Sequence, residues 1–132
     1  MSSSLQALIV EDLDFWQDTL HEILNDAGYR VWIASSYAEA MEALAQHEFH
    51  LAMIDPVLND INRHNRDGLR VLKYILDERP GMHAVVITSS SPKHIRREVD
   101  EMSADVPVLW KDEWEDERFL TIVRDFFANK ET

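Results

Sequence analysis

The sequence lacks cysteine, has only three glycines in 132 residues, and contains no long hydrophobic run. The absence of cysteine excludes a disulfide framework of the kind that stabilises small secreted scaffolds. The apolar stretches are far shorter than the roughly 20 residues that a membrane-spanning helix needs. The start, Met1 to Gln6, lacks the basic and apolar regions of a signal peptide. We therefore predict a cytoplasmic protein with no membrane partner.

Basic residues are also few, since 13 Lys and Arg stand against 25 Asp and Glu, which gives a formal net charge of −12. A surface of this sign repels nucleic acid and anionic lipid. We therefore expect no direct binding to nucleic acid. The length corresponds to one domain.

Short apolar runs alternate along the chain with segments in which apolar residues recur at helical spacing. This alternation predicts β-α-β units with parallel strands that are covered on both faces. Five such units favour an α/β, flavodoxin-like, doubly wound (βα)5 fold, with a five-stranded parallel sheet of order 2-1-3-4-5 and helices on both faces. The expected strands cover residues 5–10, 29–34, 50–54, 83–88 and 106–110, and a helix is expected after each.

Capping residues, glycine and proline mark the expected ends of the helices. Gly28 and Pro80-Gly81 are expected to end the first and third helices, and Ser91 with Pro92 to begin the fourth. Three pairs have the spacing of a capping box, in which two residues three positions apart bond to each other's backbone N–H groups. These pairs are Asp14 with Gln17, Ser36 with Glu39, and Asp112 with Glu115.

Side chains suited to ion binding follow four of the expected strands. Glu11 and Asp12 follow the first, Asp55 follows the third, Thr88 ends the fourth, and Lys111 follows the fifth. The carboxyl ends of parallel strands meet at one edge of a sheet, where such folds bind their ligands. Carboxylates gathered there suit Mg²⁺, and an ammonium with a hydroxyl suits an anion. The combination predicts Mg²⁺-assisted phosphoryl transfer to Asp55.

With these residues the chain resembles the receiver domain of two-component response regulators over nearly its full length. The resemblance implies that Asp55 accepts a phosphoryl group from a sensor histidine kinase, a phosphotransfer protein or a small phosphodonor. The motifs that carry the resemblance are Leu8-Ile9-Val10-Glu11-Asp12, Met53-Ile54-Asp55, Asp67-Gly68, Val86-Ile87-Thr88-Ser89 and Lys111.

The resemblance also assigns roles to the other positions. The expected function is that of a single receiver domain, residues 1–132 with no output domain, whose phosphorylation switches its binding to a downstream protein target. Its only expected catalysis is self-directed phosphoryl transfer and autodephosphorylation, so it is not an enzyme in the usual sense. The resemblance allows a homodimer through the fourth helix, fifth strand and fifth helix. Mg²⁺ would be held by Glu11, Asp12, Asp55 and the backbone carbonyl of Val57, and Thr88 and Lys111 would detect the phosphorylated state.

The segment after the third strand departs from the family pattern. Asn59 stands where the family commonly has a proline, and Pro56 follows the phosphoacceptor directly. The Asp-Gly step of the family comes late, so the loop 58–67 is extended. We interpret this extension as a tolerated surface insertion, because lengthening a loop costs little free energy.

Val108 is a second departure, since the family often has a switch tyrosine or phenylalanine there. Trp110 and Tyr37 are the candidates to replace that aromatic side chain. The departure motivates an alternative hypothesis, a degenerate receiver that acts as a phosphorylation-independent protein-binding module. An aspartyl phosphatase is disfavoured, because such enzymes often need a second acid two residues beyond the nucleophile, where this chain has Val57.

Overall fold

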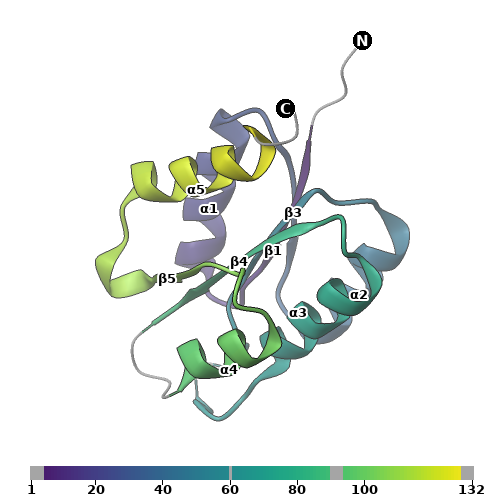
Figure 1. Ribbon diagram of the computed structural model, residues 1–132, viewed down its shortest axis with the longest axis vertical. Coiled ribbons are helices and arrows are strands. Elements are labelled where there is room, and N and C mark those ends of the chain that lie inside the picture. Colours follow the sequence, from purple (N-terminus) through teal and green to yellow (C-terminus); the bar gives the residue numbers. More distant parts are fainter. Residues whose placement is uncertain (1–4, 60, 90–93, 129–132) are drawn as a thin grey trace.

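The protein is described by a computed structural model that covers residues 5–59, 61–89 and 94–128 (Figure 1). Strands and helices alternate along the described chain. The strands are β1 Gln6–Val10, β2 Arg30–Ala34, β3 Leu51–Ile54, β4 His83–Thr88 and β5 Val108–Trp110, and the helices are α1 Asp14–Asp26, α2 Tyr37–Gln46, α3 Asp67–Glu78, α4 Ile95–Met102 and α5 Asp116–Ala128, with a 3-10 turn η1 at Lys111–Glu113.

The five strands form one parallel sheet in the order β2-β1-β3-β4-β5, which confirms the predicted topology. Val10 lies beside Ala34 and Ile54 in the register, and Ile54 lies beside Val86. The carboxyl ends of β1 and β3 are therefore level with each other at the centre of the sheet. Residues that follow these two strands emerge side by side.

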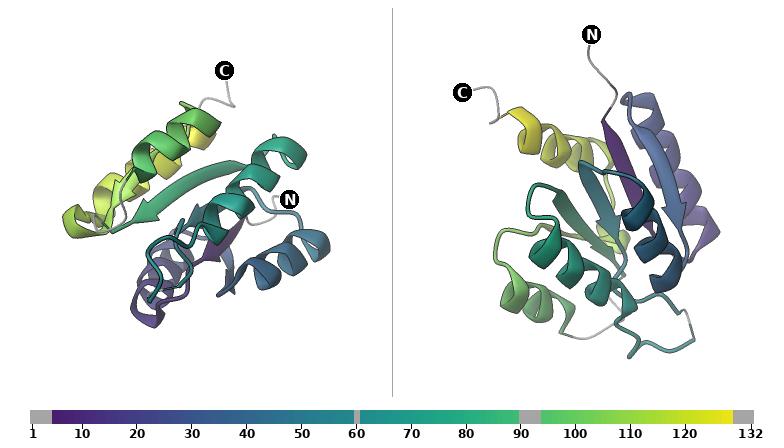
Figure 2. Two further views of the ribbon diagram at one scale, coloured as in Figure 1. Left: turned by 90° about the horizontal axis from the view of Figure 1, so that it is seen from below. Right: turned by 90° about the vertical axis from the view of Figure 1, so that its right-hand side faces the viewer.

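Strict alternation of side chains along the strands produces two cores. In β1, Leu8 and Val10 pack with α2, α3 and α4, whereas Ala7 and Ile9 pack with α1 and α5. Figures 1 and 2 show these two groups of helices on opposite sides of the sheet. Because the inner strands β1, β3 and β4 are buried on both faces, they consist almost entirely of apolar residues. In the described part of the chain, no helix has the length and apolar character required to cross a membrane.

Several predicted boundaries are confirmed. Gly28 follows the end of α1 with a φ of 95°, a conformation that glycine adopts without strain. Ser36 precedes α2, and its hydroxyl accepts a hydrogen bond from the Glu39 backbone N–H at 3.1 Å. The Glu39 carboxylate accepts from the Ser35 N–H rather than from that of Ser36. Strand β5 begins at Val108 rather than residue 106, since Pro107 has no N–H to donate.

Two predicted capping boxes are wrong. Leu13 precedes α1 without a side-chain cap, and the Gln17 amide donates to the Glu11 carbonyl at 2.6 Å and the Ser35 hydroxyl at 3.0 Å. The Gln17 side chain therefore joins the residues that follow β1 and β2 instead of capping its own helix. Asp112 lies in η1, and α5 begins at Asp116. The predicted start of the fourth helix at Ser91 and Pro92 lies outside the described residues, and the described α4 begins at Ile95.

Candidate functional site

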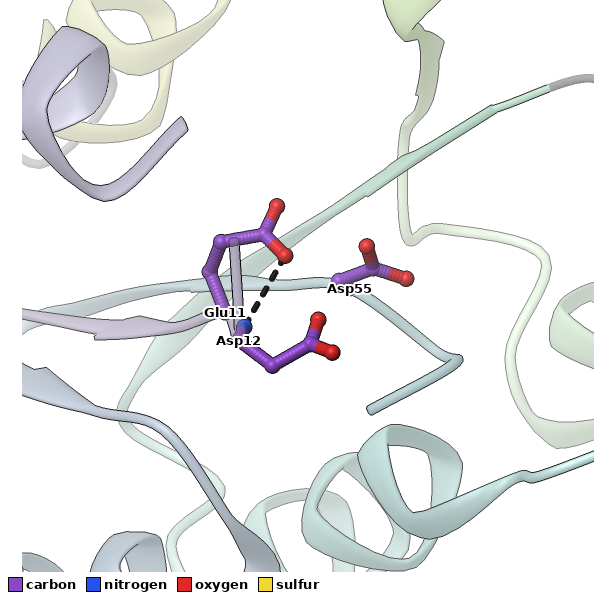
Figure 3. A group of neighbouring side chains, drawn as sticks. All are labelled: Glu11, Asp12 and Asp55. Atoms are coloured by element: carbon purple, nitrogen blue, oxygen red, sulfur yellow. Dashed lines mark hydrogen bonds between the residues drawn. The ribbon is translucent and has the colours of Figure 1, made fainter. Parts of the chain in front are cut away.

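Three carboxylates gather at the carboxyl ends of β1 and β3. The Glu11 N–H donates to the Ala34 carbonyl at 3.0 Å and the Asp55 N–H to the Val10 carbonyl at 2.9 Å, so both residues continue the sheet by one hydrogen bond. One oxygen each of Glu11, Asp12 and Asp55 lies within 4.8 Å of the others. Figure 3 shows these side chains converging from two strand ends.

Lys111, which directly follows the carboxyl end of β5, also lies in this cluster. Its ammonium donates to Asp55 Oδ2 at 2.8 Å and forms an ion pair with Glu11 Oε1 at 2.6 Å. The side chains of all three residues are at most 9% exposed. The Lys111 ammonium also lies 5.2 Å from the centroid of the Trp16 ring, which attracts it through the negative face of the indole. The site therefore contains a buried cation between two buried carboxylates.

The remaining oxygens of the cluster determine how it could hold a metal. Glu11 Oε2 accepts from the N–H groups of Asp12 and Leu13, and Asp55 Oδ1 accepts from the N–H of Val57 at 2.8 Å. Glu11 Oε1 is buried, and the Lys111 ammonium, at 2.6 Å, is its partner among the described residues. Asp12 is half-buried at the rim. Three clustered carboxylates supply the hard oxygen donors that Mg²⁺ prefers, so the residues present fit that ion.

Burial and mutual repulsion shift the titration of these groups. Burial, reinforced by the negative charge of Asp55, raises the pKa of Glu11 to about 8. Burial also raises the pKa of Asp55, although the Lys111 ammonium opposes the shift. Burial alone would lower the pKa of Lys111, but the charges of Asp55 and Glu11 outweigh it and raise that pKa. The raised pKa of Glu11 means that this group takes up a proton more readily than a free glutamic acid, which reduces its repulsion with Asp55.

The metal-free protein should lose stability as the pH rises from 6 to 9. The folded state binds the Glu11 proton more tightly than the unfolded state, so this contribution is complete below the ordinary pKa of 4.5 and disappears as the pH passes through about 8. Lys111 stays charged throughout this range because its pKa is raised. We expect the melting temperature, measured by calorimetry in EDTA, to fall by a few degrees. Saturating Mg²⁺ should remove most of the fall.

The matched control for this pH dependence is Glu11→Gln, which cannot titrate. Other groups also affect stability at alkaline pH, so the test is the difference between the two proteins. The variant should show a smaller fall in melting temperature over the same range. An equal fall in both proteins would contradict the role assigned to Glu11.

A pocket of about 380 Å³ opens onto the cluster. Asp12, Asp55 and Lys111 contribute polar groups to its wall, and the wall is completed by Leu13, Trp16, Val57, Asn59, Arg63, Ser89 and Asp112. Thr88 is fully buried at the end of β4, donates its hydroxyl to the Ser89 carbonyl at 3.3 Å, and does not line this pocket. The predicted role of the Val57 carbonyl as a metal ligand stays a prediction.

The start of α3 packs tightly against the phosphoacceptor candidate. The Gly68 N–H donates to the Pro56 carbonyl at 3.1 Å. A Cβ atom at position 68 would lie 1.8 Å from the Asp55 carbonyl oxygen. Glycine is therefore required here, because any side chain would displace the backbone that carries the Asp55 carboxylate.

The sequence profile of the response regulator receiver domain matches residues 7–123. The chain belongs to the response regulator receiver domain family. A receiver domain protein described as CheY-like, from Methanospirillum hungatei JF-1, is 25% identical and superposes with a TM-score of 0.82 over 98% of both chains. The signal receiver domain of an HD domain-containing protein from Pseudomonas fluorescens Pf-5 is 18% identical, with the same TM-score and coverage. The comparison with curated proteins gives no match.

Receiver domains interact with histidine kinases or phosphotransfer proteins, and they bind Mg²⁺ at an acidic pocket. This receiver has an acidic cluster of three carboxylates, those of Glu11, Asp12 and Asp55. Of the residues predicted from the sequence, four come into mutual contact or close proximity: Glu11, Asp12, Asp55 and Lys111. Six residues of the pocket wall were not predicted as site residues: Leu13, Trp16, Asn59, Arg63, Ser89 and Asp112. Trp16 could have been found from its position four residues beyond Asp12, whereas no local signal places Arg63 at the pocket.

Proposed function

We propose that this receiver is a phosphorylation-dependent switch in which Asp55 accepts a phosphoryl group from a histidine kinase, a phosphotransfer protein or a small phosphodonor. The observation that carries the proposal is the Lys111 ammonium, which donates to Asp55 Oδ2 beside three clustered carboxylates. In a cluster with a purely structural role, the buried acidic and basic side chains would not be accessible to a ligand from solvent. This one opens into a pocket large enough to admit the reacting end of a phosphodonor.

The residues of the site have separate roles in the proposed transfer step. An oxygen of the ionised Asp55 carboxylate attacks the phosphorus, a new P–O bond forms, and the bond from phosphorus to the donor nitrogen or oxygen breaks and leaves its electron pair on the donor. The Val57 N–H fixes the orientation of the carboxylate through Oδ1. Lys111 then has a phosphoryl oxygen as its acceptor. Mg²⁺ held by Glu11, Asp12 and Asp55, with the Val57 carbonyl, would neutralise the repulsion between carboxylate and donor.

The proposed readout uses Thr88 and Lys111. Thr88 lies at the end of β4 directly opposite Trp110 of β5 in the register. We therefore propose that a movement of the Thr88 hydroxyl toward the phosphoryl group changes the position of Trp110. Tyr37 is a weaker candidate for the missing aromatic switch, because its ring packs against the Arg70 guanidinium at 3.9 Å.

The remaining parts of the proposal concern partners. We propose that residues 1–132 act as one receiver domain that signals by contact with a separate protein target. The face formed by α4, β5 and α5 is proposed as the surface for a homodimer. The alternative, a phosphorylation-independent binding module, is motivated by Val108, which is buried in the core on the α2, α3 and α4 side of the sheet.

The decisive experiment is phosphorylation by acetyl phosphate and Mg²⁺, followed by intact-mass measurement. Wild type should gain the mass of one phosphoryl group, and EDTA should prevent the gain. Asp55→Asn should gain nothing, because an amide is not a nucleophile at neutral pH. Asp77→Asn removes an exposed carboxylate of α3 that does not line the pocket, and it should be labelled like wild type. Equal labelling of Asp55→Asn would refute the proposal, and an unlabelled wild type would favour the binding-module alternative.

A further inference from the structure

In the loop between β3 and α3, the described residues 55–59 and 61–66 are joined by hydrogen bonds from the loop's own side chains. Asn65 Oδ1 accepts from the N–H groups of Leu58 at 3.0 Å and Asp67 at 2.9 Å, which joins the two ends of the loop. Asn59 Oδ1 accepts from the N–H groups of Ile61 and Asn62. In the right-hand view of Figure 2 this loop projects at the end of the molecule opposite the N terminus. These bonds therefore fix the backbone of the described loop residues close to the end of the sheet that carries Asp55.

Arg66 fastens the same loop to α4. Its Nε donates to both carboxylate oxygens of Glu98 at 3.2 Å, and one terminal nitrogen donates to the Arg63 carbonyl at 2.7 Å. The Arg66 and Glu98 side chains are only 24% and 34% exposed, so solvent screens this ion pair less than a fully exposed one. The backbone of Arg63 is thus held in place by a contact that does not involve its own guanidinium.

Arg63 lines the pocket that contains Asp55 and Lys111. Lys111 and Arg63 are the two cations of this wall among the described residues. The two differ in their contacts, because Lys111 is already paired with Asp55 and Glu11, whereas the Arg63 guanidinium is exposed and forms no ion pair with any described residue. A planar guanidinium binds two oxygens of a phosphoryl group at once, which an ammonium does not.

We propose that Arg63 is a second cationic contact for the phosphoryl group at this site, binding the non-reacting oxygens of the donor and then of the phosphorylated Asp55. The inference rests on the function proposed above. It gives the extended loop a role at the reaction site in place of the tolerated insertion expected from the sequence. It also concerns a residue whose backbone carbonyl is held by the Arg66 guanidinium, so that its side chain starts from a defined position beside the pocket.

The inference predicts that the loss of the Arg63 charge affects the binding of two ligands differently. Removing the positive charge of Arg63 should weaken the binding of a phosphoryl-like anion, because a charge-assisted contact is lost. The same change should leave Mg²⁺ binding unchanged or make it slightly tighter, since one repelling cation is gone. Damage to the pocket would instead weaken the binding of both ligands.

Isothermal titration calorimetry separates these outcomes. Mg²⁺ alone is titrated first, and beryllofluoride, a phosphoryl analogue, is titrated in saturating Mg²⁺. Arg63→Gln should bind beryllofluoride about tenfold more weakly than wild type, with Mg²⁺ affinity no weaker. Arg63→Lys should recover part of the loss. Arg124→Gln removes an exposed arginine on α5, with the same change in net charge, and should match wild type.

Each alternative result decides a different question. If wild type binds no beryllofluoride, the proposed function itself fails. If wild type binds it and Arg63→Gln binds it equally well, the inference about Arg63 is overturned while the proposed function stands. A parallel loss of Mg²⁺ and beryllofluoride affinity in Arg63→Gln, or an equal loss in Arg124→Gln, also overturns the inference.

Discussion

Replacing Gly68 with alanine should destabilise the protein by about 3 kcal/mol. The added Cβ would lie 1.8 Å from the Asp55 carbonyl oxygen and 2.7 Å from both the Asp55 carbonyl carbon and the Pro56 Cα. These are backbone atoms, so no side-chain rotation relieves the clash, and either α3 or the end of β3 must move. We expect the loss to appear in urea unfolding monitored by circular dichroism.

Gly81→Ala is the matched control for this prediction. No atom lies within 4 Å of a Cβ built at position 81, and its backbone does not have a positive φ of the kind that requires glycine. The substitution should change the free energy of unfolding by less than about 1 kcal/mol, with stabilisation expected from the reduced entropy of the unfolded chain. Equal behaviour of the two variants would show that α3 does not approach Asp55 as closely as described.

The Gly68 variant should also affect the functional site. Displacing the backbone at Asp55 and Pro56 moves the phosphoacceptor carboxylate away from Lys111 and Asp12. If the folded fraction of Gly68→Ala is purified, its Mg²⁺ affinity by calorimetry should be weaker than that of Gly81→Ala. Unchanged Mg²⁺ binding would separate the packing role of Gly68 from the geometry of the site.

Replacing Lys111 with methionine is expected to destabilise the metal-free protein by about 3 kcal/mol at pH 8, because it leaves two buried carboxylates without their cation. The Lys111 ammonium now contacts Glu11 at 2.6 Å and Asp55 at 2.8 Å. The loss should be smaller at pH 5, because Glu11, whose pKa is raised to about 8, is then protonated and only one buried carboxylate is left without its cation. Urea unfolding in EDTA at the two pH values measures the difference.

The same variant should bind Mg²⁺ more tightly than wild type, since the ammonium and the metal compete for the same carboxylates. Added Mg²⁺ should therefore restore part of the lost stability. Lys73→Met is the control, because Lys73 is 71% exposed and forms only a surface ion pair with Asp77, worth less than about 1 kcal/mol. A stability loss in Lys111→Met no larger than that in Lys73→Met would contradict the electrostatic role of Lys111.

Predictions that depend on neighbouring residues are confirmed more often than those in which a side chain has tertiary partners. Gly28 and Ser36 mark helix ends by interactions within a few residues, and both predictions are confirmed. Asp14 and Gln17 have equally good local spacing, yet the Gln17 amide donates to Glu11 and Ser35 instead. The Gln17 side chain lies close to the ends of two strands and bonds to groups there instead of to the backbone at the start of its own helix. The sequence pattern does not show which of these hydrogen-bond partners the side chain will use.

The sequence by itself determined the strand-helix alternation and the placement of acids at the ends of β1 and β3, because a two-residue or 3.6-residue period is decided by neighbouring positions. The sheet order was predictable because five alternating units favour one doubly wound topology. Only the tertiary structure decided that Lys111 bonds to Asp55, 56 positions away, that Trp16 packs over that ammonium, and that Arg63 lines the same pocket. These contacts depend on strand register, on loop shape and on the packing of helices over the sheet. Such features arise when distant segments are buried together, and no local pattern specifies them.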